Sequence, residues 1–197
     1  MNAPIHGTFF LKGKVMEINF ENKNPVIIIL SGKAKSGKDL SFNYIKKLTN
    51  KKIISLSYSN YLKQYVSNIT SWDFKEETKP REFLQNFGIE FLPKIKEDFL
   101  IKRTLEDIDI YSYFYDLIVI TDARLIKEIE IPKNKYKNIY SIRINKLNNN
   151  YQMDEKLKKH ITETNLDNYN KFDYMINYDN NEQLNNKLKE ILEEIYE

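Results

Sequence analysis

A glycine-containing loop between a short apolar run and a helical pattern constrains the fold of this chain more than any other feature. The run at residues 26–30, VIIIL, leads directly into residues 31–39, SGKAKSGKD. The run is typical of a buried strand, and Phe42, Ile45 and Leu48 then recur at helical spacing. Strand, loop and helix therefore follow one another in the order that distinguishes a phosphate-binding loop from a chance match to its spacing.

The loop itself fits the pattern G-x-x-x-x-G-K. Gly32 and Gly37 would let the backbone curve around an anion, while Lys38 reaches the outer phosphates. A helix that begins at the loop adds unpaired N–H groups and the positive end of its dipole. An ordinary glycine-containing turn is the alternative, and the surrounding pattern argues against it. The predicted phosphate-binding residues are Gly32, Lys33, Ala34, Lys35, Ser36, Gly37, Lys38, Asp39 and Leu40.

Asp39 stands where this kind of loop usually carries a Ser or Thr that contacts the magnesium ion of the nucleotide. A carboxylate also suits Mg²⁺, directly or through a water, because this ion favours hard oxygen ligands. The alternative is that Asp39 only complements the positive end of the helix. We favour the metal-side role because of the position of Asp39 in the motif.

Size and composition exclude several classes of protein. A chain of 197 residues is long enough for one domain with a substantial core. The balance of 31 basic against 28 acidic residues does not indicate a stable nucleic-acid partner. The absence of cysteine excludes disulfides and thiolate chemistry, and the cytoplasm is the expected location. No apolar run approaches the roughly 20 residues of a membrane helix, so no membrane partner is expected.

The order of elements indicates an α/β protein. Strands are expected at residues 26–30, 52–57, 116–121, 137–145 and 173–177, and helices after the loop, at 60–66, within 72–109 and near the C-terminus. The result is a three-layer α/β/α fold with a mostly parallel central sheet in residues 25–197. Residues 1–24 form an N-terminal extension, which could contain a small hairpin around residues 12–14 and whose role is unknown.

Candidate site residues follow two of the strands. Parallel strands bring the loops after Leu30, Ser57 and Thr121 to one rim of the sheet. At that rim Asp122 could orient a magnesium ion or its water, and Arg124 could bind a phosphate or stabilise developing charge. The alternatives are a helix cap for Asp122 and a solvated charge for Arg124.

Several segments resemble one family. The loop at residues 31–39 resembles the S-G-K-x-x-S-G-K-D loop of phage-type deoxynucleoside monophosphate kinases, which are P-loop kinases. Animal-type phosphomevalonate kinases share nearly the same loop. Residues 81–88, REFLQNFG, resemble the R-x-x-L-Q-x-x-G segment that helps to form the monophosphate acceptor site in the nucleotide kinases. Residues 121–124 are similar to the D-x-R turn of that family, and residues 160–167 and 172–177 to its segment from the lid to the last strand.

The resemblance implies a function for residues 25–197. It implies ATP-dependent phosphoryl transfer to a (deoxy)nucleoside monophosphate, with Mg²⁺ as the cofactor and the nucleoside diphosphate as the product. The expected catalytic residues are Lys38, Asp122 and Arg124, with Asp39 and Asp122 on the magnesium side. The expected acceptor-binding residues are Lys63, Arg81, Gln85 and Arg124.

A lid is expected over residues 146–163. It would carry Lys156 and Lys159 and follow Arg143 on the preceding strand, and it could close over the phosphates and exclude water. This segment contains no arginine, unlike the lids of most such kinases, so a lysine-rich surface loop is the alternative.

Three functions remain open at this stage. Beside the nucleotide kinase stand a phosphomevalonate kinase-like enzyme and a regulatory module that binds ATP without transferring phosphate. The aromatic side chains of Trp72, Phe74, Phe87 and Phe91 could stack on a base or could belong to the core. The choice of base and sugar, and whether the chain forms a homodimer, stay open.

Overall fold

A five-stranded parallel sheet forms the centre of the protein. The computed structural model describes residues 5–11, 13–148 and 158–197. The strands lie in the order β4 (Ile53–Leu56), β5 (Leu117–Ala123), β3 (Val26–Ser31), β6 (Ile139–Lys146) and β7 (Tyr174–Tyr178). Every neighbouring pair is parallel. The predicted three-layer α/β/α fold is therefore confirmed, with a sheet that is wholly parallel.

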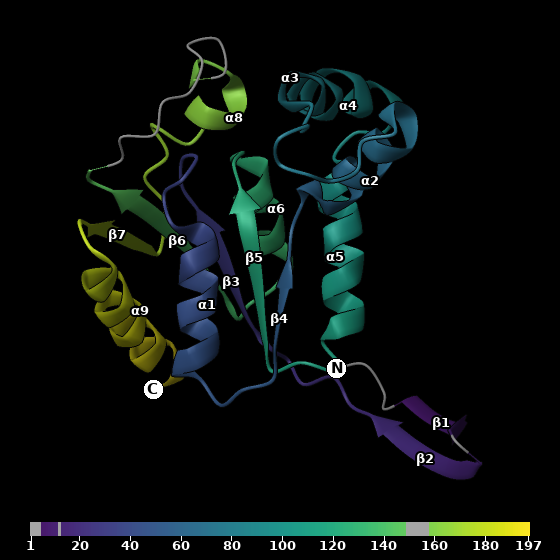
Figure 1. Ribbon diagram of the computed structural model, residues 1–197. Helices are drawn as coiled ribbons and strands as arrows, with labels where there is room; N and C mark the ends of the chain where they lie inside the picture. The colour runs from purple at the N-terminus through teal and green to yellow at the C-terminus, as the bar shows by residue number, and fades with distance from the viewer. Residues whose placement is uncertain (1–4, 12, 149–157) are drawn as a thin grey trace.

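The central strand β3 is buried on both faces, as its apolar sequence predicts. Ile27 and Ile29 belong to one core cluster, while Ile28 and Leu30 belong to the other, because successive side chains of a strand point to opposite faces. The first cluster is covered by α5 (Phe99–Tyr111) and α6 (Lys127–Lys135). The second is covered by α1 (Lys38–Leu48) and α9 (Asn181–Tyr196) (Figure 1). In the described ranges, no helix is both long and apolar enough to cross a bilayer.

A separate lobe of helices stands beyond one end of the sheet, on the other side from the short helix α8 (Ile161–Thr164) (Figure 1). The lobe has its own small core, in which Trp72 is buried and donates its indole N–H to the Lys75 carbonyl at 3.0 Å. This buried ring helps to give the helices between β4 and β5 a core of their own. The helices of the lobe are α2 (Ser59–Thr70), α3 (Arg81–Asn86), the π-helix η1 (Phe87–Phe91) and α4 (Leu92–Ile95).

No helix was expected between the strands predicted at residues 116–121 and 137–145, and the helix that lies there, α6, contains Pro132. Proline has no N–H, so the carbonyl of Glu128 loses the donor that a regular helix supplies four residues later. The buried hydroxyl of Tyr58 replaces that donor, because it donates to the Glu128 carbonyl at 2.6 Å. One long-range hydrogen bond therefore lets the helix continue past the proline and ties α6 to the start of α2.

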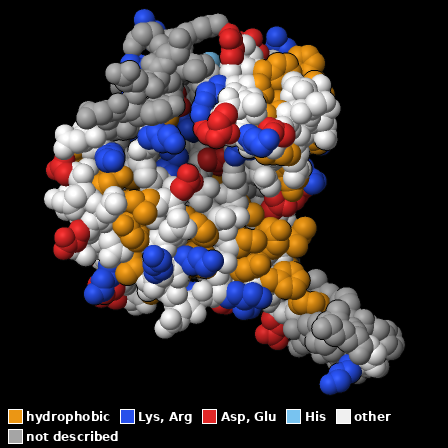
Figure 2. Space-filling view, viewed as in Figure 1, with side chains coloured by type: hydrophobic (Ala, Val, Ile, Leu, Met, Phe, Trp, Pro, Cys, Tyr) orange, Lys and Arg blue, Asp and Glu red, His pale blue; other side chains and the backbone are white. Residues whose placement is uncertain are grey.

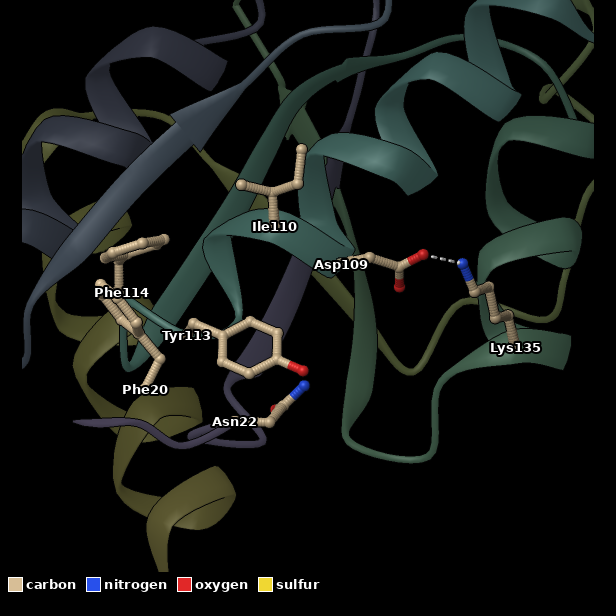
Figure 3. A pocket seen from close by; sticks show the side chains of 7 residues that line it. All are labelled: Phe20, Asn22, Asp109, Ile110, Tyr113, Phe114 and Lys135. Atoms are coloured by element: carbon tan, nitrogen blue, oxygen red, sulfur yellow. Dashed lines mark hydrogen bonds and ion pairs between the residues drawn. The ribbon is translucent and has the colours of Figure 1, made fainter. Parts of the chain in front are cut away.

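The expected N-terminal hairpin is present as β1 (Ile5–Leu11) and β2 (Lys14–Phe20), which pair antiparallel. It extends away from the sheet (Figure 1). A cavity of about 610 Å³ lies at its base, where the rings of Phe20 and Phe114 meet edge to face at 5.2 Å and Lys135 pairs with Asp109 (Figure 3). Hydrophobic side chains gather on the surface where the hairpin leaves the body (Figure 2). The division into an extension of residues 1–24 and one domain of residues 25–197 stays a prediction.

Tyr58→Phe should lower the free energy of unfolding by about 1–2 kcal/mol, because it leaves the Glu128 carbonyl buried without a donor. In a Pro132→Ala background the helix regains its own N–H, so the same Tyr58→Phe change should have a clearly smaller effect. Urea denaturation of the wild type, both single variants and the double variant measures the difference. Equal losses in the two backgrounds would contradict this account of α6.

Candidate active site

The predicted meeting of three loops at one rim of the sheet is confirmed. The loops after β3, β4 and β5 all line one cleft of about 870 Å³, which the helical lobe and residues 161–163 close on the other sides. In the space-filling view, acidic and basic side chains lie close together near the part of the surface where the helical lobe faces α8 (Figure 2). Such a cleft at the carboxyl ends of parallel strands is the usual binding place in this kind of sheet.

The loop after β3 needs glycine at both glycine positions of the pattern G-x-x-x-x-G-K. A Cβ atom on Gly32 would lie 2.5 Å from the Ile144 carbonyl oxygen. Gly37 has a φ of +90°, and a Cβ atom there would overlap the hydroxyl of Tyr178. That hydroxyl donates to the Ser36 carbonyl at 3.0 Å and so fixes the loop to β7. The curve of the backbone is therefore held by the sheet itself.

Lys38 lies inside this curve. Its ammonium group is buried and donates to the carbonyls of Gly32 at 2.8 Å and Lys33 at 2.9 Å. Burial, together with the nearby charge of Arg124, lowers the pKa of Lys38 to about 7. The carbonyls of the loop thus satisfy two of the three hydrogen-bond donors of this cation.

Ser36 is buried like Lys38, whereas the other predicted side chains of the loop are more exposed. Lys33 is exposed and pairs with Asp167 at 2.9 Å. Ala34, Lys35 and Asp39 line the cleft. Leu40 is half-buried and packs against the core between the sheet and α1, so only its backbone remains near the loop.

Arg143, which the sequence analysis grouped with the lid, lies on β6 and is buried behind the loop. Its guanidinium donates to the Ser31 hydroxyl at 3.0 Å and lies 3.6 Å from the Asp167 carboxylate. Burial lowers the pKa of Arg143, and the charge of Arg124 acts in the same direction. Lys38, Arg124 and Arg143 therefore form a group of cations that repel one another and favour an anion between them.

The remaining lid predictions are only partly placed. Lys156 lies outside the described residues, and Lys159 is exposed and is not among the residues that line the cleft. From the described end of the lid segment, Ile161, Thr162 and Glu163 reach the cleft. The lid residues that line the cleft are thus an acid and its neighbours, which the sequence analysis did not select.

Asp122 lies within β5, which continues to Ala123, and not just beyond the strand as the sequence suggested. Its carboxylate accepts hydrogen bonds from the Ser57 hydroxyl at 2.6 Å and from the N–H groups of Tyr58 at 2.8 Å and Ser59 at 3.1 Å. Asp122 is thus a helix cap, one of the two predicted alternatives, although the helix is α2 from the preceding loop. The same carboxylate lines the cleft.

The donors in the cleft fit a magnesium ion that is shared with phosphates. Mg²⁺ is usually bound by one or two carboxylates together with phosphate oxygens and waters. The exposed carboxylate of Asp39 is available for direct contact, whereas Asp122 would act through a water because α2 already uses its oxygens. Among the described residues, no three His, Asp or Glu side chains gather into a metal site of their own. The magnesium ion stays a prediction.

Glu128 is a buried acid that sequence reasoning did not select. One of its carboxylate oxygens accepts the N–H groups of Arg124 at 2.6 Å and Leu125 at 2.9 Å. Burial raises the pKa of Glu128 to about 7. These bonds fix the turn that aims the Arg124 side chain into the cleft. Its position four residues after Arg124, in the segment that resembles the D-x-R turn of the nucleotide kinases, was the signal that the sequence offered.

Three of the predicted acceptor residues lie on the wall formed by the helical lobe, whereas the fourth, Arg124, lies at the end of β5 beside the loop. Lys63, Arg81 and Gln85 line the cleft, and Arg81 forms an ion pair with Glu76. Gln85 donates to the Thr162 hydroxyl at 3.4 Å, so α3 touches α8 across the cleft. The floor between them is aliphatic, and it is formed by Leu62, Leu84, Ile89, Leu92 and Leu100.

The aromatic residues considered for base stacking do not line this cleft. Trp72 is buried in the core of the lobe, Phe74 and Phe91 are exposed, and Phe87 stacks between Phe83 and Phe91. The aromatic residues of the described chain that do line it are Tyr58 and Phe99. Of the two possibilities given for these rings, membership of the core holds for Trp72 and Phe87, and none of the four lines the cleft.

Comparisons with known proteins show the fold. No protein-family model matches the chain, and no curated protein matches its sequence. The structure is similar to TT1252 from Thermus thermophilus, with a TM-score of 0.53 and 11% identity over 86% of this chain and 97% of that one.

Two shikimate kinase structures are also similar. The enzyme from Bacteroides thetaiotaomicron gives a TM-score of 0.49 and 17% identity over 85% of this chain and 98% of that one. The enzyme from Aquifex aeolicus gives a TM-score of 0.48 and 12% identity over 85% and 96%. At these identities the likeness concerns the fold, and the function must be argued from the cleft.

The lowered pKa of Lys38 predicts proton uptake when a triphosphate binds. At pH 8 most Lys38 side chains are neutral, because the pKa lies near 7. A polyanion raises that pKa, so binding should take up close to one proton at pH 8 and little at pH 6, where the group is already charged. Calorimetry of Mg-ATP binding in buffers of different ionisation enthalpy measures the uptake. It should disappear in Lys38→Met, and an equal uptake in that variant would contradict the assignment.

Proposed function

We propose that this protein transfers the γ-phosphoryl group of ATP to the phosphate of a (deoxy)nucleoside monophosphate. The observation that carries the proposal is that a phosphate-binding loop and a second group of basic side chains face each other in one cleft. A P-loop alone would also suit a protein that only binds ATP. Basic residues on the opposite wall supply a place for a second phosphate.

The donor side of the cleft suits the outer phosphates of ATP. The loop offers backbone N–H groups at the start of α1, and Lys38 lies within the loop. Arg124 reaches the same region from the end of β5, where the bonds to Glu128 hold its backbone. Both cations can therefore contact the group that is transferred.

The acceptor side suits a phosphate attached to an apolar or planar body. Arg81 can bind a phosphate with two parallel hydrogen bonds, and Lys63 adds a point charge. The aliphatic floor beyond them can bury the rest of the acceptor. Arg81 and Gln85 belong to the segment whose pattern resembles the acceptor site of the nucleotide kinases, and this resemblance favours a nucleotide.

The reaction needs positioning and charge neutralisation and no nucleophile from the protein. An oxygen of the acceptor phosphate attacks the γ-phosphorus as the bond to the β–γ bridging oxygen breaks, which leaves ADP and a diphosphate. Lys38 and the loop N–H groups hold the donor, and Arg124 stabilises charge on the transferring group. Magnesium, held on the side of Asp39, would neutralise part of the phosphate charge. Residues 161–163 exclude water from this side of the cleft.

A phosphomevalonate-like acceptor is the second candidate. The lining of the cleft favours it in one respect, since Lys79 and Lys96 add positive charge and none of the four rings considered for stacking is there. A small phosphorylated acid would use this charge and would not need a planar surface. The two candidates therefore differ in the acceptor and share the donor side.

ADP formation from ATP and Mg²⁺ tests the proposal. Each common ribo- and deoxyribonucleoside monophosphate is offered separately, with mevalonate 5-phosphate beside them, and the diphosphate products are identified. Stimulation by a nucleotide supports the proposal and names the acceptor. Stimulation by mevalonate 5-phosphate alone supports the second candidate. ATP binding without stimulation by any acceptor would instead indicate a regulatory module.

Lys38→Ala should remove about 3–5 kcal/mol of transition-state stabilisation, which is roughly a 10²–10⁴-fold loss in kcat/KM. The reason is the loss of the charged clamp on the transferring group. The matched control is Lys47→Ala, which removes an exposed lysine from the other end of the same helix. A folded Lys38→Ala protein with turnover near that of Lys47→Ala would contradict the site.

Arg81→Ala should raise the KM of the acceptor roughly 10-fold to 100-fold and leave the Kd of ATP unchanged, since a charge-assisted hydrogen bond contributes about 1.5–3 kcal/mol. Arg103→Ala on α5 serves as the control because that arginine, which lies over the Tyr61 ring and pairs with Glu106, does not line the cleft. Acceptor kinetics and ATP titrations are both needed. Weaker ATP binding with an unchanged acceptor KM would place Arg81 on the wrong side of the cleft.

A further inference from the structure

We propose that the carboxylate of Glu163 is an internal anion that occupies the phosphate-binding loop when no nucleotide is bound. It would take the place of an outer phosphate oxygen and would have to leave before the triphosphate can bind fully. The inference rests on the proposed function only in that the loop binds phosphate. It adds that an acid of the chain itself occupies the loop until a triphosphate displaces it.

The contacts of Glu163 are those that a phosphate would make. One carboxylate oxygen accepts the N–H of Ala34 in the loop at 3.1 Å, and the other forms an ion pair with the Arg124 guanidinium. Backbone N–H groups of such a loop together with an arginine form a recurring arrangement for phosphate binding. Ala34, Arg124 and Glu163 all line the cleft. The acid therefore uses donors that the reaction needs for its substrate.

Burial shows that this placement is specific. The Glu163 side chain is only 8% exposed, and the Arg124 side chain is 29% exposed. A carboxylate is removed from water only at a large free-energy cost unless charge and hydrogen bonds compensate it. Arg124 and the Ala34 N–H supply that compensation here. Glu163 is thus held in the loop region and does not merely pass over it.

Further contacts hold the whole segment in this position. Asp167 pairs with Lys33 of the loop at 2.9 Å. The side chain of Asn165 accepts the Ile126 N–H at 2.8 Å, next to the turn that carries Arg124. With the Thr162 contact to Gln85, α8 and the turn after it touch the loop, the start of α6 and the lobe. Displacing Glu163 therefore requires part of this segment to move.

Occupation by an internal anion lowers the apparent affinity for an external one, because only the fraction of molecules with a vacated loop can bind it. A triphosphate brings several oxygens and more charge, so it can displace one carboxylate. The displacement also frees Arg124 to contact the transferring group. Removing the acid should thus strengthen triphosphate binding, whereas a merely supportive acid would weaken it when lost.

The experiment is titration of inorganic tripolyphosphate with Mg²⁺ into the wild type, Glu163→Gln and Glu163→Asp. Glu163→Gln removes the charge, and Glu163→Asp keeps the charge but is too short to span Arg124 and the Ala34 N–H together. We expect roughly tenfold tighter binding for Glu163→Gln and a smaller gain for Glu163→Asp. The control is Glu190→Gln, which removes an equal charge from an exposed position on α9 and should leave binding unchanged.

Each outcome decides the proposal. Equal or weaker binding in both Glu163 variants overturns it, and so does an equal gain in Glu190→Gln. The Glu163→Asp arm remains informative if Glu163→Gln does not fold, which urea denaturation would show. If the wild type turns over and the variants do not bind more tightly, the internal anion is overturned and the proposed kinase stands. If the variants bind more tightly but no acceptor stimulates ADP formation, the internal anion stands and the kinase is overturned. If neither the wild type nor any variant binds tripolyphosphate, both proposals are overturned.

Discussion

Mutual repulsion among Lys38, Arg124 and Arg143 is the constraint on which the rest of the cleft depends. Three cations converge on one backbone loop, and burial alone would lower the pKa of each. The protein meets this cost with carbonyls around Lys38 and with two acids, Glu163 at the end of the lid segment and Asp167 just after it. Carbonyls and carboxylates of the chain itself therefore surround these cations.

The sheet and the loop could be predicted because their signals are local. A fully buried strand reads as a continuous apolar run, and the pattern of the loop lies within residues 32–38, although the atoms that crowd its glycines belong to Ile144 and Tyr178. Helix α6 could not be predicted in this way. Pro132 normally marks the end of a helix, and the hydroxyl that compensates it belongs to Tyr58, which is 70 residues from Glu128 along the chain. Only the folded chain brings the donor to the carbonyl.

The residues of the candidate site also differ in whether a local pattern or a long-range contact defines them. Lys38, Arg81 and Arg124 could be named from motifs, since each lies in a short pattern with a known kind of role. Glu163 lies 129 residues from the N–H that it accepts and 39 from its arginine, so no spacing could indicate the contact. The open choice between base stacking and the core for the aromatic rings has a related cause. The sequence shows that Trp72 and Phe87 are aromatic, but the side of the lobe that each faces depends on how its helices pack.

The contact between α3 and α8 has a consequence for how the binding of the two proposed substrates is coupled. Gln85 on the acceptor wall meets Thr162, which lies next to the acid that faces the loop. A donor that moves α8 must therefore also disturb the acceptor wall. Coupling of this kind is reciprocal by thermodynamic necessity, so whatever factor the donor applies to the affinity for the acceptor, the acceptor applies to the affinity for the donor. A few atoms at the mouth of the cleft would thus make the two half-sites cooperative.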